Sequence, residues 1–148
     1  MGTENRKLPR VKNADKPRPD EIVRKRGAAD LQNGWLGRHG TLYLCDERVV
    51  FVPTILDTLM GAKRRELLLN DIVEIERLPR SPDGLIPGAK RPRVIISTNE
   101  CAYEFMFGDL DAWIDAFQIV YRHRVKNGKP HEPVVLREGS TTELLMEL

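Results

Sequence analysis

The sequence has few of the residues that build covalent or metal-bound frameworks. Its 148 residues include only two cysteines, Cys45 and Cys101, which lie far apart and form no Cys-x-x-Cys pair. The three histidines, His39, His123 and His131, are isolated from one another. This spacing favours neither a disulfide framework nor a zinc site. We therefore expect no metal, no cofactor, two inert thiols buried in strands, and a reducing environment.

Long apolar runs are also missing. No window approaches the roughly 18 apolar residues typical of a membrane-spanning helix, and no charged start leads into an apolar stretch as in a secretory signal. Arg6 stands where N-myristoylation after Gly2 requires Ser or Thr. From these patterns we expect a cytoplasmic chain with neither a transmembrane segment nor a lipid anchor.

Groups that could perform catalysis do not occur together. Gly84–Lys90 has three residues between its glycines, where a phosphate-binding P-loop has four, and Lys90 does not follow the second glycine directly. The acidic residues around 71–74 and 109–111 are explained by turns and helix capping, with no second cluster to form a general acid and base pair. The sequence predicts a non-enzymatic protein.

Positive charge is concentrated near the N-terminus. The whole chain has a net charge of +2, but residues 1–26 carry nine basic and four acidic side chains. Residues 1–20 contain three prolines and no apolar period, so we expect a disordered basic tail there. The near balance of charge over residues 27–126 argues against a specific nucleic-acid-binding face.

Alternating apolar residues predict a mainly β domain over residues 21–127. The clearest signals are two hairpins, in which β-rich runs are separated by short polar connections. About seven antiparallel strands are expected, at residues 21–26 (an edge strand), 40–45, 48–52, 63–69, 72–78, 93–98 and 101–107.

One amphipathic helix should follow the strands. Asp109 is a suitable N-cap, and Asn127-Gly128 a suitable stop. The apolar residues at helical spacing are Leu110, Trp113, Ile114, Phe117, Val120 and Tyr121, and we expect them to face the core. In the C-terminal extension, residues 128–148, we expect a short strand at 133–136 and a short helix after a capping box at 140–143.

The first hairpin carries a family resemblance. Residues 40–51, Gly-Thr-Leu-Tyr-Leu-Cys-Asp-Glu-Arg-Val-Val-Phe, resemble the defining stretch of GRAM domains. Leu69-Asn-Asp-Ile72, the second hairpin and Trp113 are similar to later steps of the same family. Cys45 stands where threonine is common, and Glu100 where glycine is common. The resemblance covers about residues 21–126.

The resemblance implies a PH-like, partly open β-barrel closed by one C-terminal amphipathic helix. The fold would be mainly β, or α+β by content. Domains of this kind act by binding, with phosphoinositides or other membrane lipids as one ligand class and proteins as the other. Fold alone does not decide between these classes.

An apolar loop followed by cations is the strongest candidate site. The predicted membrane-contact residues are Ile55, Leu56, Leu59 and Met60. The predicted anion-binding residues are Lys63, Arg64 and Arg65, with Lys90, Arg91 and Arg93 on another long connection. Apolar side chains would enter the lipid interface while the cations contact phosphates.

Other interpretations stay open at this stage. The apolar loop could instead cover a barrel end, with the basic runs as solvated charges of edge strands. Trp35 could pack over the barrel opening or lie at a contact surface. The C-terminal Leu144–Leu148 cluster could dock on a partner or fold back. Peripheral binding to anionic lipid is the first hypothesis for function, and protein interaction or self-association is the second. The oligomeric state is not predicted.

Overall fold

The computed structural model describes residues 17, 20–33, 36–78, 93–129, 133–138 and 141–144. Predictions for the N-terminal tail up to residue 16, for Trp35, for Lys90 and Arg91, and for the chain after Leu144 fall outside the described residues. None of the helices in the described ranges is long and apolar enough to cross a bilayer.

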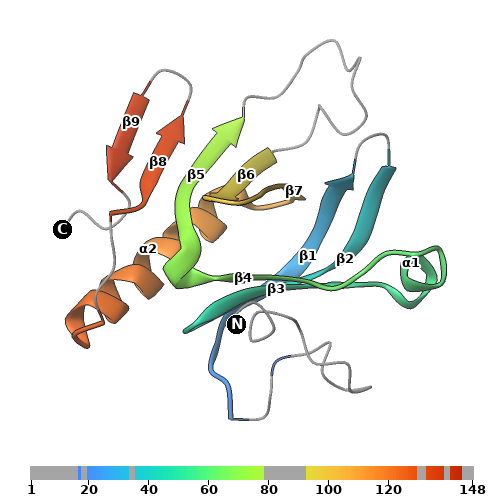
Figure 1. Cartoon of the computed structure of the whole chain (residues 1–148), viewed down its shortest axis with the longest axis horizontal. Coiled ribbons are helices and arrows are strands. Elements are labelled where there is room, and N and C mark those ends of the chain that lie inside the picture. The colour runs from blue at the N-terminus through green and yellow to red at the C-terminus, as the bar shows by residue number, and fades with distance from the viewer. Residues whose placement is uncertain are drawn as a thin grey trace.

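One mixed sheet curves around the core and is accompanied by one long helix (Figure 1). In chain order the elements are β1 (Val23–Asn33), β2 (Leu36–Cys45), β3 (Arg48–Pro53), α1 (Ile55–Leu59), β4 (Arg65–Leu68), the 3-10 helix η2 (Leu69–Asp71), β5 (Ile72–Leu78), β6 (Arg93–Thr98), β7 (Ala102–Phe107), α2 (Leu110–Lys126), β8 (Val135–Glu138) and β9 (Thr141–Leu144). The strand order is β4-β3-β2-β1-β7-β6-β5-β8-β9. All neighbouring strands are antiparallel except β5 and β8.

The prediction of a short edge strand at residues 21–26 is wrong. β1 extends to Asn33 and pairs on both sides, with β2 and with β7. Ala29 and Leu31 are buried in the core, so an inward-facing apolar alternation continues the strand beyond its basic first half.

The C-terminal extension adds two strands to the seven predicted for the domain, and the first of them, β8, corresponds to the short strand expected at 133–136. β8 lies parallel to β5 and brings Val134 and Leu136 into the core. β9 occupies residues 141–144, where a helix was expected. Backbone pairing with β8 replaces the local capping pattern, because unpaired strand edges leave N–H and C=O groups without partners.

The first hairpin requires a glycine at position 40. Gly40 lies opposite Pro53, and a Cβ built on it would be 2.3 Å from the carbonyl oxygen of Val52 and 2.8 Å from the ring of Phe51. Any larger residue would push the two strands apart. This close approach gives a physical reason for the glycine in the family-like motif.

Helix α2 begins and ends where the sequence predicted. The Asp109 side chain accepts a hydrogen bond from the Ala112 N–H, and Gly128 follows the helix with a φ of 76°. Trp113 is buried and stacks on Phe107 with ring centroids 4.9 Å apart. The apolar face of the helix therefore packs into the sheet.

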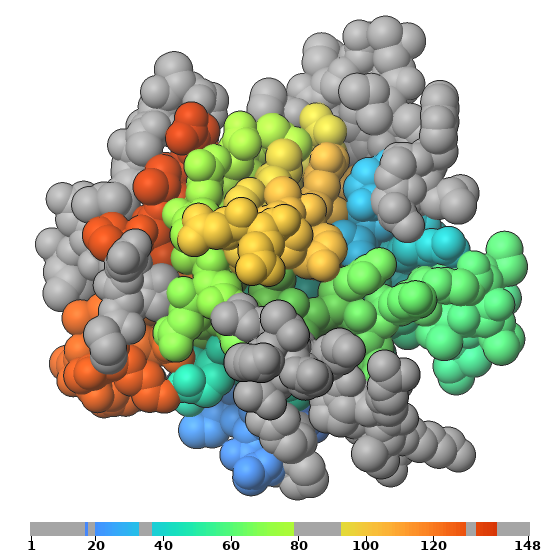
Figure 2. All heavy atoms as spheres, in the orientation of Figure 1, coloured from blue at the N-terminus to red at the C-terminus, as the bar shows by residue number. Residues whose placement is uncertain are grey.

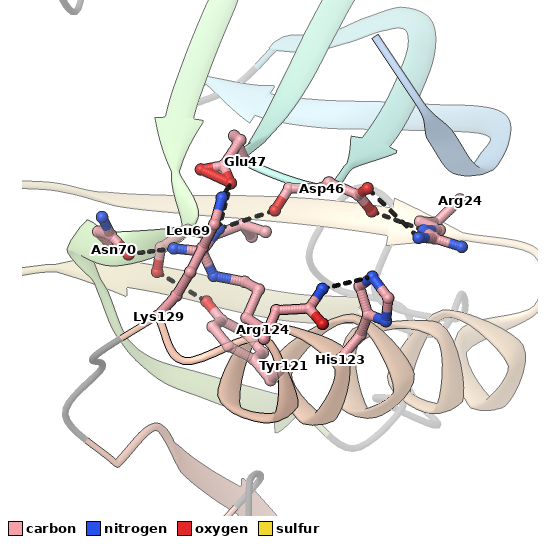
Figure 3. A network of polar contacts seen from close by, with 10 residues as sticks. Arg24, Asp46, Glu47, Leu69, Asn70, Tyr121, His123, Arg124 and Lys129 are labelled. Carbon is pink, nitrogen blue, oxygen red and sulfur yellow. Dashed lines mark hydrogen bonds and ion pairs between the residues drawn. The ribbon is translucent and has the colours of Figure 1, made fainter.

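The strand ends nearest the last turns of α2 are joined by partly buried polar contacts (Figure 3). Arg124, in the last turn of α2, is buried. Its guanidinium donates to the carbonyl oxygen of Asp46 at 2.8 Å, to the Glu47 carboxylate at 2.9 Å and to the side-chain oxygen of Asn70. We call this region, formed by Asp46, Glu47, Asn70 and Arg124, the stapled end.

A second buried arginine holds the same strands on their other face. Arg48 donates two hydrogen bonds of 2.7 Å to Glu21 and one of 3.0 Å to Glu66. The side chains of Arg48, Glu21 and Glu66 are only 4%, 8% and 9% exposed. The carboxylates outweigh the cost of burial and raise the pKa of Arg48.

Candidate functional site

Helix α1 exposes its apolar residues, which is the reverse of an ordinary amphipathic surface helix. Ile55 is 84% exposed and Leu59 is 79% exposed, with Leu56 and Met60 also well exposed. These four residues, which we call the knob, protrude at the right of Figures 1 and 2. The only partly buried member of the helix is the polar Asp57. An exposed apolar cluster of this kind is typical of an interaction surface.

Polar contacts to β2 hold the knob in place. The His39 N–H donates to the Asp57 carboxylate at 2.5 Å, and the Thr54 N–H donates to the His39 carbonyl at 2.9 Å. The Thr54 side chain caps the helix by accepting from the Asp57 N–H at 3.2 Å. Gly61 ends the turn with a φ of 97°. The knob is anchored without burying any of its apolar side chains.

A small cavity of about 80 Å³ lies beside the knob. It is bounded by the chain leaving α1 and by residues of β1, β2, β3, β4 and β7. Its lining residues are Leu31, Gln32, Arg38, Phe51, Gly61, Ala62, Lys63, Arg65 and Tyr103. We call this cavity the cationic pocket, because three of these residues are basic and none is acidic.

Strand register explains why two arginines line the pocket. Arg38 lies opposite the buried Leu31, and Arg65 lies opposite the buried Phe51. Residues directly opposite each other in an antiparallel pair point to the same face of the sheet. Both arginines therefore share the inner, core-facing side of the sheet. The Arg65 guanidinium lies 6.0 Å from the centre of the Tyr103 ring.

The pocket cations are not neutralised by the part of the chain that the structure describes. None of its ion pairs involves Arg38, Lys63 or Arg65. Within the described part of the chain, the buried Nε atom of Arg38 has no hydrogen-bond partner, and the same is true of the Nε atoms of Arg93 and Arg124. With three basic residues and no acidic residue in its lining, this site favours an anion.

The fold is shared with solved structures of low sequence similarity. The hSac2 domain of the human phosphoinositide phosphatase Sac2 matches 84% of this chain and 80% of its own, with a TM-score of 0.58 and 12% identity. The Vps36 N-terminal PH domain matches 74% of this chain and 86% of its own, with a TM-score of 0.54 and 13% identity.

The chain has a PH-like fold. No protein-family model matches it, and no curated protein sequence matches it significantly. At these identities the structural likeness defines the architecture of the domain alone.

The predicted anion-binding residues of this PH-like domain separate into three groups. Lys63 and Arg65 line the pocket, and Arg64 lies between them in sequence. Arg93 instead pairs with Glu104 at 3.2 Å and does not line the pocket. Lys90 and Arg91 are outside the described residues.

Arg38 was missed by the sequence analysis, although a signal for it was present. Its position continues the two-residue period of Leu42 and Leu44, which are buried. A cation in an apolar period is unusual, because charged side chains are rarely placed toward a core without a partner. Extending this two-residue period from Leu42 toward the N-terminus, past Gly40, would have placed Arg38 on the inner face of its strand.

The two cysteines differ in environment. Cys45 is buried as predicted, and burial raises the pKa of its thiol to about 12. The prediction that Cys101 is buried is wrong, because it lies in the turn before β7 rather than within the strand. Thr98 bonds across this turn and leaves the Cys101 side chain exposed.

Proposed function

We propose that this PH-like domain is a GRAM-type, non-enzymatic module that associates peripherally with anionic membrane lipid. In this proposal α2 closes the barrel, the knob enters the lipid interface, and the adjoining cations contact phosphoinositide-like headgroups. The cytoplasmic face of a membrane is the proposed location, since anionic lipid is concentrated there.

The exposed apolar knob next to cations that have no ion pair among the described residues carries this proposal. Four apolar side chains are held out by polar contacts, and Lys63 and Arg64 follow Met60 within four residues. Apolar burial and attraction to anionic lipid then act at the same place. Basic residues near an anionic membrane contribute about 1 kcal/mol each.

The test is co-sedimentation with phosphatidylcholine vesicles, with and without phosphatidylserine, at low and physiological ionic strength. Wild type should pellet only with the anionic vesicles, and less at higher salt. Reversing two charges, in Lys63→Glu/Arg64→Glu, should weaken binding at least about thirtyfold, because about 2 kcal/mol is lost. Leu59→Asp should also abolish pelleting.

Matched controls are available on α2. Ile119 is 59% exposed, so Ile119→Asp makes the same apolar-to-acidic change away from the knob. Arg122→Glu/Lys126→Glu makes the same charge reversal at two exposed helix positions. Both controls should pellet like wild type. Failure of wild type to bind any vesicle would contradict the lipid proposal and favour a protein partner for the knob.

A further inference from the structure

The outer face of β2 and β3 is apolar, although the face of an antiparallel sheet that points away from the core is commonly polar and solvated. Tyr43 lies opposite Val50 in the strand register, and both alternate with residues that face the core. Tyr43, Cys45 and Val50 are only 8%, 0% and 0% exposed. We call these three residues, with the partly buried Val52, the outer cluster.

No helix or strand of the described residues lies over the outer cluster. The buried residues of α2 belong to the core on the inner face, α1 buries none of its residues, and the nine strands form one sheet. Glu21 reaches the rim through its bonds to Arg48, and Arg26 lies 5.9 Å from the centre of the Tyr43 ring. Two side chains at the rim are too few to cover Val50 completely.

The N-terminal segment enters the sheet beside this cluster. Glu21 is fixed by two hydrogen bonds of 2.7 Å to Arg48, which is two residues before Val50 and therefore on the same face of β3. The residues before Glu21 thus begin at one end of the outer cluster. The β1–β2 turn lies at the other end of β2, and the connections beside β5, β8 and β9 belong to the opposite end of the strand order.

The apolar residues of this segment recur every third position. Residues 8–19 have no helix or strand period, but Leu8, Val11, Ala14 and Pro17 are spaced by three, and every residue between them except Pro9 is polar. A polyproline II helix has three residues per turn, so these four side chains share one side of it. Pro17, the described residue of the segment, is partly buried. We call the four residues the apolar stripe.

The segment also matches the cluster in length and charge. In polyproline II form the stripe is about 28 Å long, which exceeds the roughly 13 Å from Arg48 to Val52 along β3. Arg48, Glu21 and Glu66 together have a net charge of −1, whereas residues 8–19 contain four basic side chains and one acidic one. Polyproline II segments dock on aromatic surfaces, and Tyr43 supplies one here.

We propose that residues 8–19 pack across the outer cluster as an intramolecular strap in polyproline II form. Taken alone, this basic segment buries too little apolar surface to become ordered. The outer cluster supplies the missing surface, with the apolar stripe toward the sheet and the basic side chains toward its acidic rim. The strap does not depend on the proposed function, because the knob lies on α1, beyond the end of β3.

The first test uses the two cysteines of the full chain. Cys101 is exposed and should react with Ellman's reagent at once, whereas Cys45, in the outer cluster, should react slowly. Val11→Asp places a charge on the apolar stripe and should make Cys45 react at least tenfold faster. Asn13→Asp, two residues away and off the stripe, should leave the rate unchanged. Circular dichroism checks that both variants are folded.

The second test does not depend on how a stripe variant folds. A paramagnetic spin label is attached at Asn13→Cys in a Cys101→Ser background, where the remaining thiol, Cys45, is buried. The label should broaden the methyl resonances of Val50 and leave those of Ile119, an exposed residue of α2, unchanged.

Unbroadened Val50 methyl groups overturn the strap, whatever the thiol rates are. Equal rates for Cys45 in wild type, Val11→Asp and Asn13→Asp also overturn it, because the stripe then covers nothing. Equal acceleration by both variants overturns the three-residue register. None of these outcomes affects the lipid proposal, which is tested on the knob and its cations.

Discussion

The two ends of β2, β3 and β4 differ in the partners that surround their arginine side chains. At the stapled end, Arg124 is surrounded by oxygen atoms of three residues from two turns. At the knob end, Arg38 lines a pocket that contains no carboxylate. Buried charges are normally retained only with partners, so the stapled end is explained by stability. For the knob end we propose binding, rather than stability, as the reason for the arrangement.

The sharpest test of this comparison is the removal of an arginine that forms ion pairs with buried carboxylates. Arg48→Met should destabilise the domain by about 3–5 kcal/mol, because it leaves two nearly buried carboxylates without their cation. Urea unfolding measures the change. Arg122→Met, at an exposed arginine, should stay within about 0.5 kcal/mol of wild type. A loss below about 1 kcal/mol for Arg48→Met would contradict a structural role.

A single hydroxyl at the stapled end should have a smaller effect. The buried Tyr121 hydroxyl donates to the Leu69 carbonyl at 3.0 Å, and burial raises its pKa. Tyr121→Phe removes this donor without creating a cavity and should cost about 1–2 kcal/mol. Thermal unfolding by circular dichroism measures the difference. An unchanged melting temperature would mean that this hydrogen bond contributes nothing to the stability of the domain.

At the knob end, removal of an arginine should be nearly neutral for stability. Arg38→Met takes away a cation that has no ion pair among the described residues and replaces it with an apolar side chain of similar length. We expect a change within about 0.5 kcal/mol, or a gain in stability. The same urea experiment applies. A loss as large as that of Arg48→Met would show that the pocket cation is structural and would remove the contrast between the ends.

Another small effect is expected in the pH dependence of stability at the stapled end. Burial would raise the pKa of Glu47, but hydrogen bonds from Lys129 and Arg124 outweigh it and lower the pKa. A carboxylate with a lowered folded-state pKa stabilises the fold above its unfolded pKa of about 4.3, and loses this contribution as pH falls through the folded pKa. Glu47→Gln should cost about 0.2–1 kcal/mol near pH 7. The cost should shrink as pH falls below about 4, so that it is smaller at pH 3 than at pH 7. Unfolding at both pH values measures it, and a pH-independent cost would contradict the assignment.

Local patterns in the sequence were sufficient to predict the hairpins and the long helix. The alternation in residues 40–52 and the cap at Asp109 depend on neighbours only a few residues away. Residues 141–144 show where this fails, because their capping pattern is local but their strand pairing is with β8. The position of β1 between β2 and β7 is likewise a long-range property.

The candidate site was predictable in part. The apolar residues of α1 and the cations after them could be read directly, because they are contiguous in the chain. Whether the knob was exposed or covered a barrel end could not be decided, since that depends on the polar anchor between Asp57 and His39. The ion pair of Arg93 with its cross-strand partner Glu104 could not be predicted either, because the two residues are on different strands.

By itself, the sequence determined the β-rich domain, its single long helix and the apolar segment next to cations, because periodicity and capping are properties of neighbouring residues. Only the tertiary structure decided which charges have partners. Arg38 and Arg124 are both arginines near the end of an element, yet strand register places Arg38 in the cationic pocket, and helix packing places Arg124 among oxygen atoms. That difference arises from residues distant in sequence, which strand pairing and helix packing bring together.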